Sequence, residues 1–384
     1  MEQALYWLAL KQVLGVGPVL YKRLIEHFKT PEAVFSADEE ALWAVEGISE
    51  SVAKNILTFK GFDSAKREME KIDKDGVTLL TFNDPDYPSL LLTIYDPPPM
   101  LYRKGLAGGV TTNSDPYPIA MVGTRNMTYY GKSVASLLAG ELVRVGITIV
   151  SGFARGIDAT AHRAAMATGG RTFAVLGSGI DVIYPKEHKK LYDEIIENGF
   201  IFSEFPMGTH PEPRYFPQRN RVISGLSLGC VVCEASTKSG SLITARFAME
   251  QGREVFAIPG SIFSETSKGV HSLIASGAKL VADVQDILKE LLPQLKVATV
   301  SQGTLPTQGA IFSPRPTGAV LPQATVALIG DEAKLYNLLS LEPKQINTII
   351  EASSLAPSVV SYCLLELELK GIVRQLGGQF FIRA

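Results

Sequence analysis

The sequence predicts an α/β protein whose core is a doubly wound, Rossmann-like parallel sheet, with a small all-α module before it and a winged-helix-like module after it. Between residues 117 and 292, short apolar runs alternate with helical runs. Near-continuous apolar strands in this order are typical of a parallel sheet covered by helices on both faces. Because strand–helix–strand crossovers are right-handed, the alternation favours a doubly wound sheet.

The core is expected to contain six strands separated by helices. We expect strands at Ile119–Gly123, Thr148–Gly152, Phe173–Gly177, Ile201–Phe205, Cys230–Ala235 and Glu254–Gly260. We expect helices at Gly131–Val145, Ala159–Thr168, His188–Glu197 and Ser241–Gln251. The predicted core domain is 117–292.

Residues 1–62 are expected to form short helices around two glycine turns, Leu14–Pro18 and Val45–Ser49. This pattern resembles a pair of helix-hairpin-helix units of the SAM-like kind, in which N–H groups at a helix start can hold a phosphate. A module that only packs, with glycines ending its helices, explains the same turns. Ser49 stands where the motif prefers glycine, which favours the second interpretation.

Two stretches are expected to connect these modules. Residues 63–116 are interpreted as a lead-in to the core, since Asp84–Pro88 and Asp96–Pro99 mark turns and extended chain. Residues 293–325 contain no Asp or Glu and carry five prolines. That composition is typical of a flexible linker.

Residues 326–384 are expected to form the winged-helix-like module. Helices are predicted at Ala327–Leu339, Pro343–Ala352 and Pro357–Lys370, and short strands at Gly371–Gln375 and Gln379–Ile382. In this order the third helix would be the recognition helix. It carries Glu366 and Glu368 but only Lys370 as a cation. The charge is poor for DNA, so a protein-docking or purely structural role is an equal alternative.

Composition restricts the class of protein only loosely. The 384 residues include 37 Lys and Arg and 39 Asp and Glu, a net charge of −2, which excludes a uniformly basic protein but not a local phosphate-binding patch. Three cysteines do not make a disulfide framework, and a reducing cytoplasm is the simplest setting. No apolar run approaches the roughly 18 residues that span a bilayer, and Met1–Leu10 lacks the order of a signal peptide.

Glycine-rich turns follow several of the predicted strands. Gly123–Arg125 follows the first strand, Ser151–Asp158 the second and Gly177–Gly179 the third. Ligands of open parallel sheets bind beyond these carboxyl ends, where glycine lets the backbone approach a ligand and helix starts aim N–H groups at anions. We therefore expect an anion pocket that includes Arg125; glycines serving only tight turns are the alternative.

The stretch Phe216–Ser227 is expected to be a rigid, doubly cationic loop between the fourth and fifth strands. Arg219 and Arg221 offer planar guanidinium groups suited to phosphate, and Asn220 adds a neutral donor and acceptor. Aromatic residues near the same rim could stack bases, with packing inside the loops as the alternative. These aromatic residues are Tyr184, Phe202, Tyr215 and Phe216.

Two patterns resemble known sites but have simpler explanations. Lys238–Ala245 lacks the residue order of a phosphate-binding loop, so we expect Ser241 to cap a helix. Cys230 and Cys233 have CxxC spacing, but they lie in a predicted buried strand without a second pair. A place in the core is the simpler interpretation.

Two pairs of titratable residues are candidates for acid–base chemistry. Asp158 and His162 stand four apart on one predicted helix and could form an acid–base pair, although an aspartate at a helix start is stabilised by the dipole alone. Glu204 and Glu234 end neighbouring strands and could pair as carboxylates. A cationic partner from Arg219 or Arg221 is the simpler expectation for them.

With these motifs in order, the sequence resembles the DNA-processing protein A family, also called Smf. The matching motifs are Gly123-Thr124-Arg125 with Tyr130-Gly131, Ser151-Gly152 through Gly156-Ile157-Asp158, Gly177-Ser178-Gly179 through Tyr184-Pro185, Ser203-Glu204, Phe216 to Ser227, Glu234 with Ser239 to Ala245, and Pro259-Gly260. Each motif is weak alone, but the ordered series over residues 120–280 is specific. One departure is His271, where the family usually has asparagine.

The resemblance implies a protein that binds single-stranded DNA in natural transformation, protects the incoming strand and helps to load the RecA recombinase onto it. It also implies a homodimer formed through the Rossmann-like domain, and neither catalysis nor a cofactor or metal is expected. Together with the strand-end argument, it gives the expected DNA contacts. These are Arg125, Ser151, Gly152, Phe153, Arg155, Gly177, Ser178, Gly179, Phe216, Arg219, Asn220, Arg221, Ser239, Gly240 and Ser241.

Two other functions stay open at this point. Nucleotide-cleaving phosphoribohydrolases have similar glycine-rich strand ends, but their Pro-Gly-Gly-x-Gly-Thr-x-x-Glu signature is absent from Glu234–Ser241. The other alternative is a sensor that binds a mononucleotide and signals through the C-terminal module.

Overall fold

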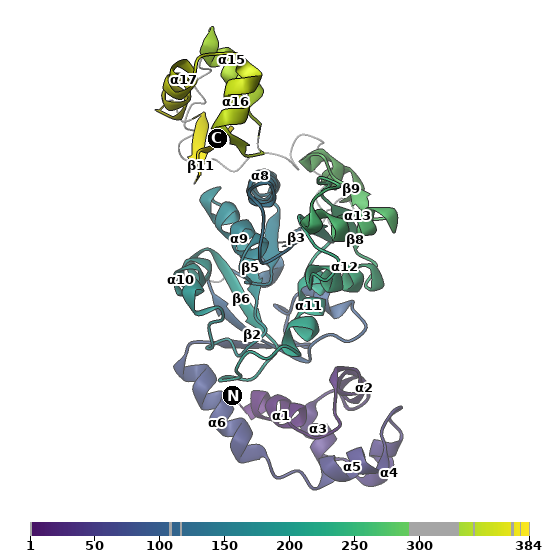
Figure 1. Cartoon of the computed structure of the whole chain (residues 1–384). Coiled ribbons are helices and arrows are strands. Elements are labelled where there is room, and N and C mark those ends of the chain that lie inside the picture. The colour runs from purple at the N-terminus through teal and green to yellow at the C-terminus, as the bar shows by residue number, and fades with distance from the viewer. Residues whose placement is uncertain are drawn as a thin grey trace, which may run out of the picture. The chain divides into compact units, whose positions relative to one another are not determined.

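The computed structural model describes residues 2–106, 110–115, 117–291, 330–340, 342–369, 372–376 and 378–383. These residues form two compact units. One contains the N-terminal helices and the large sheet, and the other contains Thr128–Val134 and the C-terminal residues from 330 onward (Figure 1). The predicted linker at 293–325 lies outside the described residues.

The large sheet has nine strands among the described residues, in the order β1-β2-β6-β5-β4-β3-β7-β8-β9. Their bounds are β1 Thr78–Thr81, β2 Met100–Gly105, β3 Pro118–Val122, β4 Thr148–Ser151, β5 Thr172–Val175, β6 Gly199–Ser203, β7 Gly229–Val232, β8 Glu254–Ala257 and β9 Lys279–Leu280. Neighbouring strands from β6 through β9 run parallel, whereas β1 and β2 are antiparallel additions at the β6 edge. This confirms the predicted doubly wound, mostly parallel sheet.

Helices connect the parallel strands on both faces. Their bounds are α7 Ser89–Leu92, α8 Tyr129–Arg144, α9 Ile157–Ala167, α10 Lys189–Asn198, α11 Tyr215–Gly225, α12 Ser241–Glu250 and α13 Lys268–Ala275, with short 3-10 turns at Thr112–Ser114, Lys186–His188 and Glu265–Ser267. Residues 284–291 are also helical. Figure 1 shows α9 and α10 on one side of the sheet and α11, α12 and α13 on the other.

The strand order places a topological switch point at β3. From β3 the chain moves to β4 on one side, and it later returns to β7 on the other side. Connections that leave in opposite directions open a crevice beyond the carboxyl end of such a strand. The turn after β3, which begins at Gly123, therefore lies at the position where this sheet can hold a ligand.

The lead-in prediction for residues 63–116 was wrong in part, because this stretch supplies two strands of the sheet. Met100, Leu101 and Tyr102 are fully buried on β2, which pairs with β1 on one side and β6 on the other. The apolar run after the prolines was the available signal. Strand β2 is short, and it runs antiparallel to its neighbours. It therefore does not belong to the repeating strand–helix pattern on which the prediction was based.

The predicted loop at Phe216–Ser227 is instead mostly helix α11. Pro217 stands in the first turn of that helix, where its missing N–H needs no partner. The helix is buried from Arg219 to Gly225. A proline near the start and small residues near the end are typical of loops, but they also suit a short buried helix.

The N-terminal residues form a helical module that packs on the sheet. Its helices are α1 Glu2–Lys11, α2 Pro18–Phe28, α3 Pro31–Ser36, α4 Glu39–Trp43, α5 Glu50–Leu57 and α6 Phe62–Lys74. Gly15 and Gly47 occupy equivalent turns, and both have φ of +92°, a conformation that favours glycine. Ser49 caps α5 by accepting a hydrogen bond from the Val52 amide at 3.3 Å.

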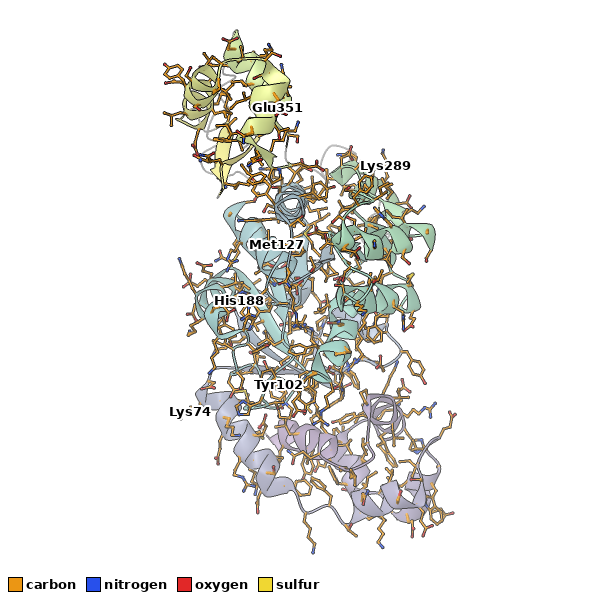
Figure 2. The ribbon with its side chains drawn as sticks, viewed as in Figure 1. Lys74, Tyr102, Met127, His188, Lys289 and Glu351 are labelled. Atoms are coloured by element: carbon orange, nitrogen blue, oxygen red, sulfur yellow. The ribbon has the colours of Figure 1, made fainter. Side chains whose placement is uncertain are left out.

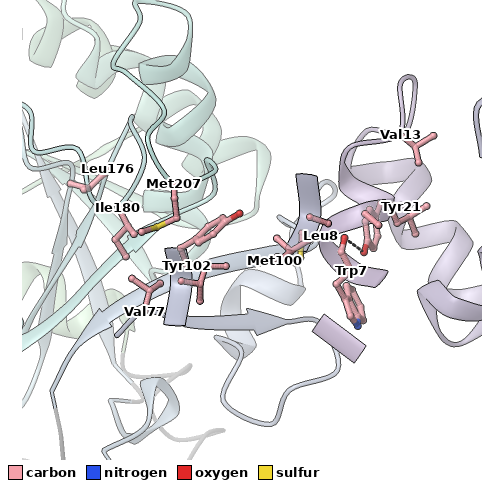
Figure 3. Packing of buried hydrophobic residues seen from close by; sticks show 14 of the residues in the cluster. Trp7, Leu8, Val13, Tyr21, Val77, Met100, Tyr102, Leu176, Ile180 and Met207 are labelled. Carbon is pink, nitrogen blue, oxygen red and sulfur yellow. Dashed lines mark hydrogen bonds between the residues drawn. The ribbon is translucent and has the colours of Figure 1, made fainter. Parts of the chain in front are cut away.

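A single apolar cluster joins this module to the core. Trp7 and Tyr21 stack with ring centroids 5.5 Å apart, and the Tyr21 hydroxyl donates to the Trp7 carbonyl at 3.0 Å. The cluster continues through Met100 and Tyr102 of β2 to Met207 (Figure 3). Tyr102, which is labelled in Figure 2, is a residue of the sheet that also belongs to the apolar cluster of the N-terminal helices.

Polar contacts accompany this apolar cluster. The Lys11 ammonium donates to the backbone carbonyl of Glu204 and lies 5.7 Å from the centroid of the Tyr102 ring. Burial lowers the pKa of Lys11 to about 8, while Glu204 acts in the opposite direction. Glu68 of α6 accepts from the Tyr102 hydroxyl at 3.0 Å and from the Met207 amide at 2.6 Å. Hydrogen bonds therefore hold the module on the sheet in addition to the buried apolar surface.

The C-terminal unit has the order expected of a winged helix. It contains α15 Asp331–Leu338, β10 Lys344–Gln345, α16 Ile346–Ser353, α17 Pro357–Leu369, β11 Val373–Leu376 and β12 Phe380–Arg383. The three strands form one antiparallel sheet in the order β10-β12-β11. Among the described residues no single helix is long and apolar enough to cross a membrane; Ile346–Ser353 and Pro357–Glu368 meet the test only together, across a bend of 113°.

Two glycines with similar φ allow a test of how the β3 turn is built. Gly156 has φ of +77°, and a Cβ there would lie 2.3 Å from the Thr124 carbonyl oxygen; Gly169 has φ of +79° and open space around it. We expect Gly169→Ala to cost about 1–2 kcal/mol of stability, the conformational cost alone. Gly156→Ala should cost distinctly more, because the Thr124 turn must also move. Denaturant unfolding midpoints measure the difference, and equal losses would contradict this account.

Candidate functional site

A cavity of about 640 Å³ opens at the switch point beyond β3. Five segments line it: the turn after β3, the start of α9, the chain around Tyr184 after β5, the chain around the start of α11 and the chain before and within α12. A smaller cavity adjoins it and shares Arg125, Tyr184, Phe216 and Arg219. The sheet-end pocket expected from the glycine-rich turns is therefore present, with cationic and aromatic groups in its wall.

Arg125 is the exposed cation of this pocket. Its turn is fixed because the Thr124 amide donates to the Glu234 carbonyl at 2.7 Å and the Asn126 amide donates to the Thr124 hydroxyl at 3.2 Å. The Arg125 guanidinium lies 5.3 Å from the centroid of the Phe216 ring. Within the described ranges no carboxylate forms an ion pair with it, so its charge is available to a ligand.

Two aromatic rings form one wall of the pocket. The rings of Tyr184 and Phe216 lie 5.8 Å apart between centroids, tilted by 38°. Tyr184 is 43% exposed and offers an open face. A Cβ on Gly177 would lie 2.8 Å from Phe216, so this glycine is needed for the ring to pack against the end of β5.

Arg219 lines the pocket but is buried, so its guanidinium group is not exposed in the way expected of a phosphate-binding arginine. It is 5% exposed, and its Nη1 donates to the carbonyls of Gly152 and Val175, which ties the ends of β4 and β5 together. Burial lowers the pKa of Arg219 to about 10, while Asp158 acts in the opposite direction. Asn220, its neighbour on α11, accepts from Arg219 at 3.2 Å and donates to the Gly240 carbonyl at 3.3 Å.

The expectation that Arg221 offers its guanidinium to phosphate was wrong. Arg221 lies outside both cavity linings, is 4% exposed and forms a buried ion pair with Glu204. It also lies 3.3 Å from the Asp96 carboxylate and donates to the Asp96 carbonyl at 2.6 Å. A cationic partner for Glu204, the simpler of the two expectations for that carboxylate, is thereby confirmed.

Three other predicted contact residues hold the strand ends and do not line either cavity. The Ser151 hydroxyl donates to the Met121 carbonyl at 2.6 Å. Phe153 is 1% exposed and packs edge-on against His188, with centroids 5.3 Å apart. A Cβ on Gly179 would lie 2.7 Å from the Pro206 carbonyl oxygen, which explains glycine at that turn without a ligand.

The remaining predicted residues do line the cavities. Gly152, Gly177 and Ser178 line the smaller one, although the Ser178 hydroxyl donates to the Val182 carbonyl at 2.7 Å. Arg155 lies at its rim, exposed and paired with Glu187. Ser239, Gly240 and Ser241 line the larger cavity. Gly240, not Ser241 as expected, is the N-cap residue of α12.

Sequence reasoning missed several residues of the lining and misjudged one pair. Thr124, Asn126, Pro211, Pro213, Ser236 and Thr244 all line the larger cavity. Their proximity to the recognised motifs was the available signal. Asp158 lines the cavity too, and its carboxylate accepts from the Ala154 amide at 3.3 Å. Burial raises the pKa of the Asp158 carboxyl, against the effect of Arg219.

The proposed acid–base pair is not formed in this structure. His162 lines neither cavity, and its Nδ1 lies 2.6 Å from the Thr172 hydroxyl oxygen. Burial lowers its pKa to about 3, so the ring is neutral at ordinary pH. Cys230 and Cys233 are free and buried, as the core interpretation predicted. No group of His, Cys, Asp and Glu suited to a metal occurs among the described residues.

Comparison with known protein families shows to which family this chain belongs. The model of DNA recombination-mediator protein A matches residues 78–292. The chain belongs to this family. Separate models match the flanks: a SAM-like helix-hairpin-helix tandem over residues 8–59 and a DprA winged-helix domain over residues 319–379. The family is one of DNA-processing proteins, and the resemblance inferred from the ordered motifs is confirmed.

Individual relatives agree with this assignment. Protein Smf of Synechocystis is 37% identical over 100% of this chain and 99% of its own length. The DNA processing protein DprA of Bacillus subtilis is 45% identical over 57% of this chain and 72% of its own. Among solved structures, DprA of Streptococcus pneumoniae has a TM-score of 0.64 at 34% identity and covers 76% of this chain and 98% of its own.

A structure from Helicobacter pylori adds a ligand to the comparison. It has a TM-score of 0.51 at 31% identity and covers 57% of this chain and 96% of its own. That structure is described as showing the single-stranded DNA binding mode of DNA processing protein A. That description concerns the H. pylori protein.

The ion pair of Arg221 predicts a large effect on stability. Arg221→Met leaves the buried Glu204 carboxylate without its partner, and we expect a loss of about 3–5 kcal/mol. Arg155→Met is the matched control, because it removes an exposed ion pair, which contributes little. Denaturant unfolding compares the two variants. A similar, small shift for both would show that the Arg221 pair does not hold α11.

Proposed function

We propose that this chain binds single-stranded DNA in the cavity beyond β3 and does so without catalysis. The observation that carries the proposal is the grouping of the unpaired Arg125 guanidinium with the Tyr184 and Phe216 rings at the rim of one cavity. Proteins that bind single strands combine a cationic groove for the backbone with aromatic faces on which bases stack. The H. pylori relative, whose structure is described as showing single-stranded DNA binding, supports the same ligand.

The proposed contacts follow the geometry of the lining. Arg125 meets a phosphate and Tyr184 stacks on a base. From the residues expected by sequence, we retain as contacts those that line a cavity. They are Arg125, Gly152, Arg155, Gly177, Ser178, Phe216, Arg219, Asn220, Ser239, Gly240 and Ser241.

We further propose a role in recombination in the cytoplasm. The protein would protect incoming single strands in transformation, act as a homodimer through the Rossmann-like domain and help to load a RecA recombinase. The family description as a DNA recombination mediator supports this role. Hydrolysis of a nucleotide remains the alternative function, and release of free base from a nucleoside monophosphate would favour it.

Arg125→Ala is expected to weaken binding to every single-stranded sequence alike. Each lost phosphate contact should also flatten the log–log salt dependence by roughly 0.7 for single strands. Fluorescence anisotropy with a labelled oligo-dT at two salt concentrations measures both effects. Arg144→Ala is the control, since Arg144 is an exposed arginine at the far end of α8. Equal effects of the two substitutions would place the strand elsewhere.

Tyr184→Leu is expected to lower affinity about tenfold, because stacking on an aromatic ring is worth about 1–3 kcal/mol per base. The loss should vanish on an abasic strand that keeps every phosphate. Tyr95, 78% exposed, provides the control Tyr95→Leu. A loss for Tyr184→Leu that persists on the abasic strand would mean that the ring supports the fold of the rim and not a base.

The mediator role has its own measurement. RecA-dependent ATP hydrolysis on single strands already covered by single-strand-binding protein should rise when this protein is added. The rise should be smaller with Arg125→Ala, because loading requires the mediator to hold the strand. No rise with the wild-type chain, under conditions where it binds DNA, would remove the recombinase from the proposal and leave the DNA binding intact.

A further inference from the structure

The turn after β8 exposes two large apolar side chains. Phe263 is 90% exposed, the largest fraction for any large apolar residue in the described ranges, and its neighbour Ile262 is 73% exposed. Strand β8 is parallel to β7, and β7 is parallel to β3, so this turn lies at the same edge of the sheet as the larger cavity. Single exposed apolar residues are common on protein surfaces, but two together on one turn form a patch suited to an interaction.

Hydrogen bonds hold this turn in place. The Phe263 amide donates to the Ser261 hydroxyl at 3.3 Å, and the Ser264 amide donates to the Ser261 carbonyl at 3.0 Å. The Gly260 carbonyl oxygen lies 3.1 Å from Nε2 of His271, the residue that departs from the usual asparagine of the family. The exposure of the Phe263 ring is therefore a property of a turn whose backbone is fixed.

The same turn packs directly on the wall of the larger cavity. The Ala235 amide donates to the Thr266 carbonyl at 2.8 Å, and the Thr266 hydroxyl donates to the Glu234 carboxylate at 2.6 Å. A Cβ on Gly269 would lie 2.5 Å from the Ser236 carbonyl oxygen, so the start of α13 is in close contact with that segment. Because Ser236 lines the cavity, the turn after β8 and the cavity wall form one continuous surface.

The charges along this surface suit a phosphate backbone. Lys238 is exposed and lies between two residues of the cavity lining, Ser236 and Ser239. No ion pair with a described residue engages it. The carboxylate nearest to Phe263 along the chain, Glu265, is paired with Lys268. A free cation therefore stands between the cavity and the Phe263 ring, and the neighbouring carboxylate is neutralised.

The strand order places these groups in a row. Tyr184 follows β5, Arg125 follows β3, Lys238 follows β7 and Phe263 follows β8, and the sheet order is β5-β4-β3-β7-β8. Since neighbouring strands lie about 4.8 Å apart, the four steps span about 19 Å. This length corresponds to about six nucleotides of a stacked single strand. Aromatic rings at both ends with cations between them are the combination by which proteins bind single strands.

We propose that Phe263, with Ile262 beside it, is a second base-stacking platform for the strand held in the cavity. The strand would cross the carboxyl edge of the sheet from Tyr184 to Phe263. This inference rests on the proposed function and deepens it, because it assigns the path of the strand. A second copy of the chain could also cover the apolar patch, but continuity with the cavity wall and the free Lys238 favour the nucleic acid.

Phe263→Leu tests the platform by fluorescence anisotropy with a labelled oligo-dT of about twelve nucleotides. The substitution should lower the affinity about fivefold, because one base loses its aromatic partner. The salt dependence should stay as in the wild type, since no phosphate contact is removed. On an abasic strand of the same length the variant and the wild type should bind alike. Tyr95→Leu is the matched control and should behave as the wild type on both strands.

Photochemical crosslinking locates the strand on the wild-type protein directly. An oligo-dT in which 5-iododeoxyuridine replaces one thymidine at a time is bound to the full chain, irradiated and digested with trypsin. Crosslinks are expected on the peptide Glu254–Lys268, which contains Phe263, and on Thr172–Lys186, which contains Tyr184. The other aromatic residue of the first peptide, Phe256, is fully buried, so a crosslink there is assigned to Phe263.

The outcomes separate this inference from the proposed function. Unchanged affinity of Phe263→Leu, with crosslinks on Thr172–Lys186 but none on Glu254–Lys268, would overturn the second platform and leave single-strand binding in place. An affinity loss that persists on the abasic strand, with a change of molecular mass in sedimentation, would assign the patch to contact between copies of the chain. No binding by the wild type would remove the proposed function itself. Phe263 is exposed, so Phe263→Leu should keep the unfolding midpoint of the wild type.

Discussion

The ion pair between Arg221 and Glu204 fixes α11 at the end of β6, and the rest of the pocket is built on this helix. From one face of α11, Arg221 reaches Glu204 and Asp96. Arg219 on the same helix ties the ends of β4 and β5 together through two carbonyls. With both arginines engaged in the interior, Phe216 at the start of the helix is held over the turn of Arg125. The Phe216 ring also lies 6.0 Å from the Arg219 guanidinium, so the arginine that joins the strand ends supports the ring as well.

Local pattern was sufficient to predict the core of the fold. Strands and glycine turns could be identified because burial on both faces makes each strand continuously apolar, and because each turn needs a residue that tolerates close approach. The observed strands end one to three residues before their predicted ends, since residues such as Gly123 and Gly152 already belong to the turns. The position of the cavity at the carboxyl ends of the strands could be predicted from the glycine-rich turns that follow those strands along the chain.

Arg219 and Arg221 mark the limit of that reasoning. Arginine is rarely buried unless it is paired. The sequence indicates a cationic partner for Glu204 but does not choose between Arg219 and Arg221, and nothing near residue 221 shows that Asp96 will also contact it. The same limit applies to β2, whose neighbour β6 lies about a hundred residues further along the chain. Whether a charged group is a ligand contact or an internal strut is decided by distant residues, so composition and spacing alone do not separate the two roles.

The bond between Lys11 and the Glu204 carbonyl has a consequence for biosynthesis. Its two partners stand 193 residues apart, so α1 leaves the ribosome long before β6 exists. At roughly 5–20 residues per second, the first helix waits about 10–40 s for its partner. Throughout that interval the ammonium of Lys11 and the apolar faces of Trp7 and Leu8 remain uncovered by the core. Synthesis of β6 and the residue that follows it, and not synthesis of the helices themselves, is therefore the earliest point at which the Lys11 bond can form.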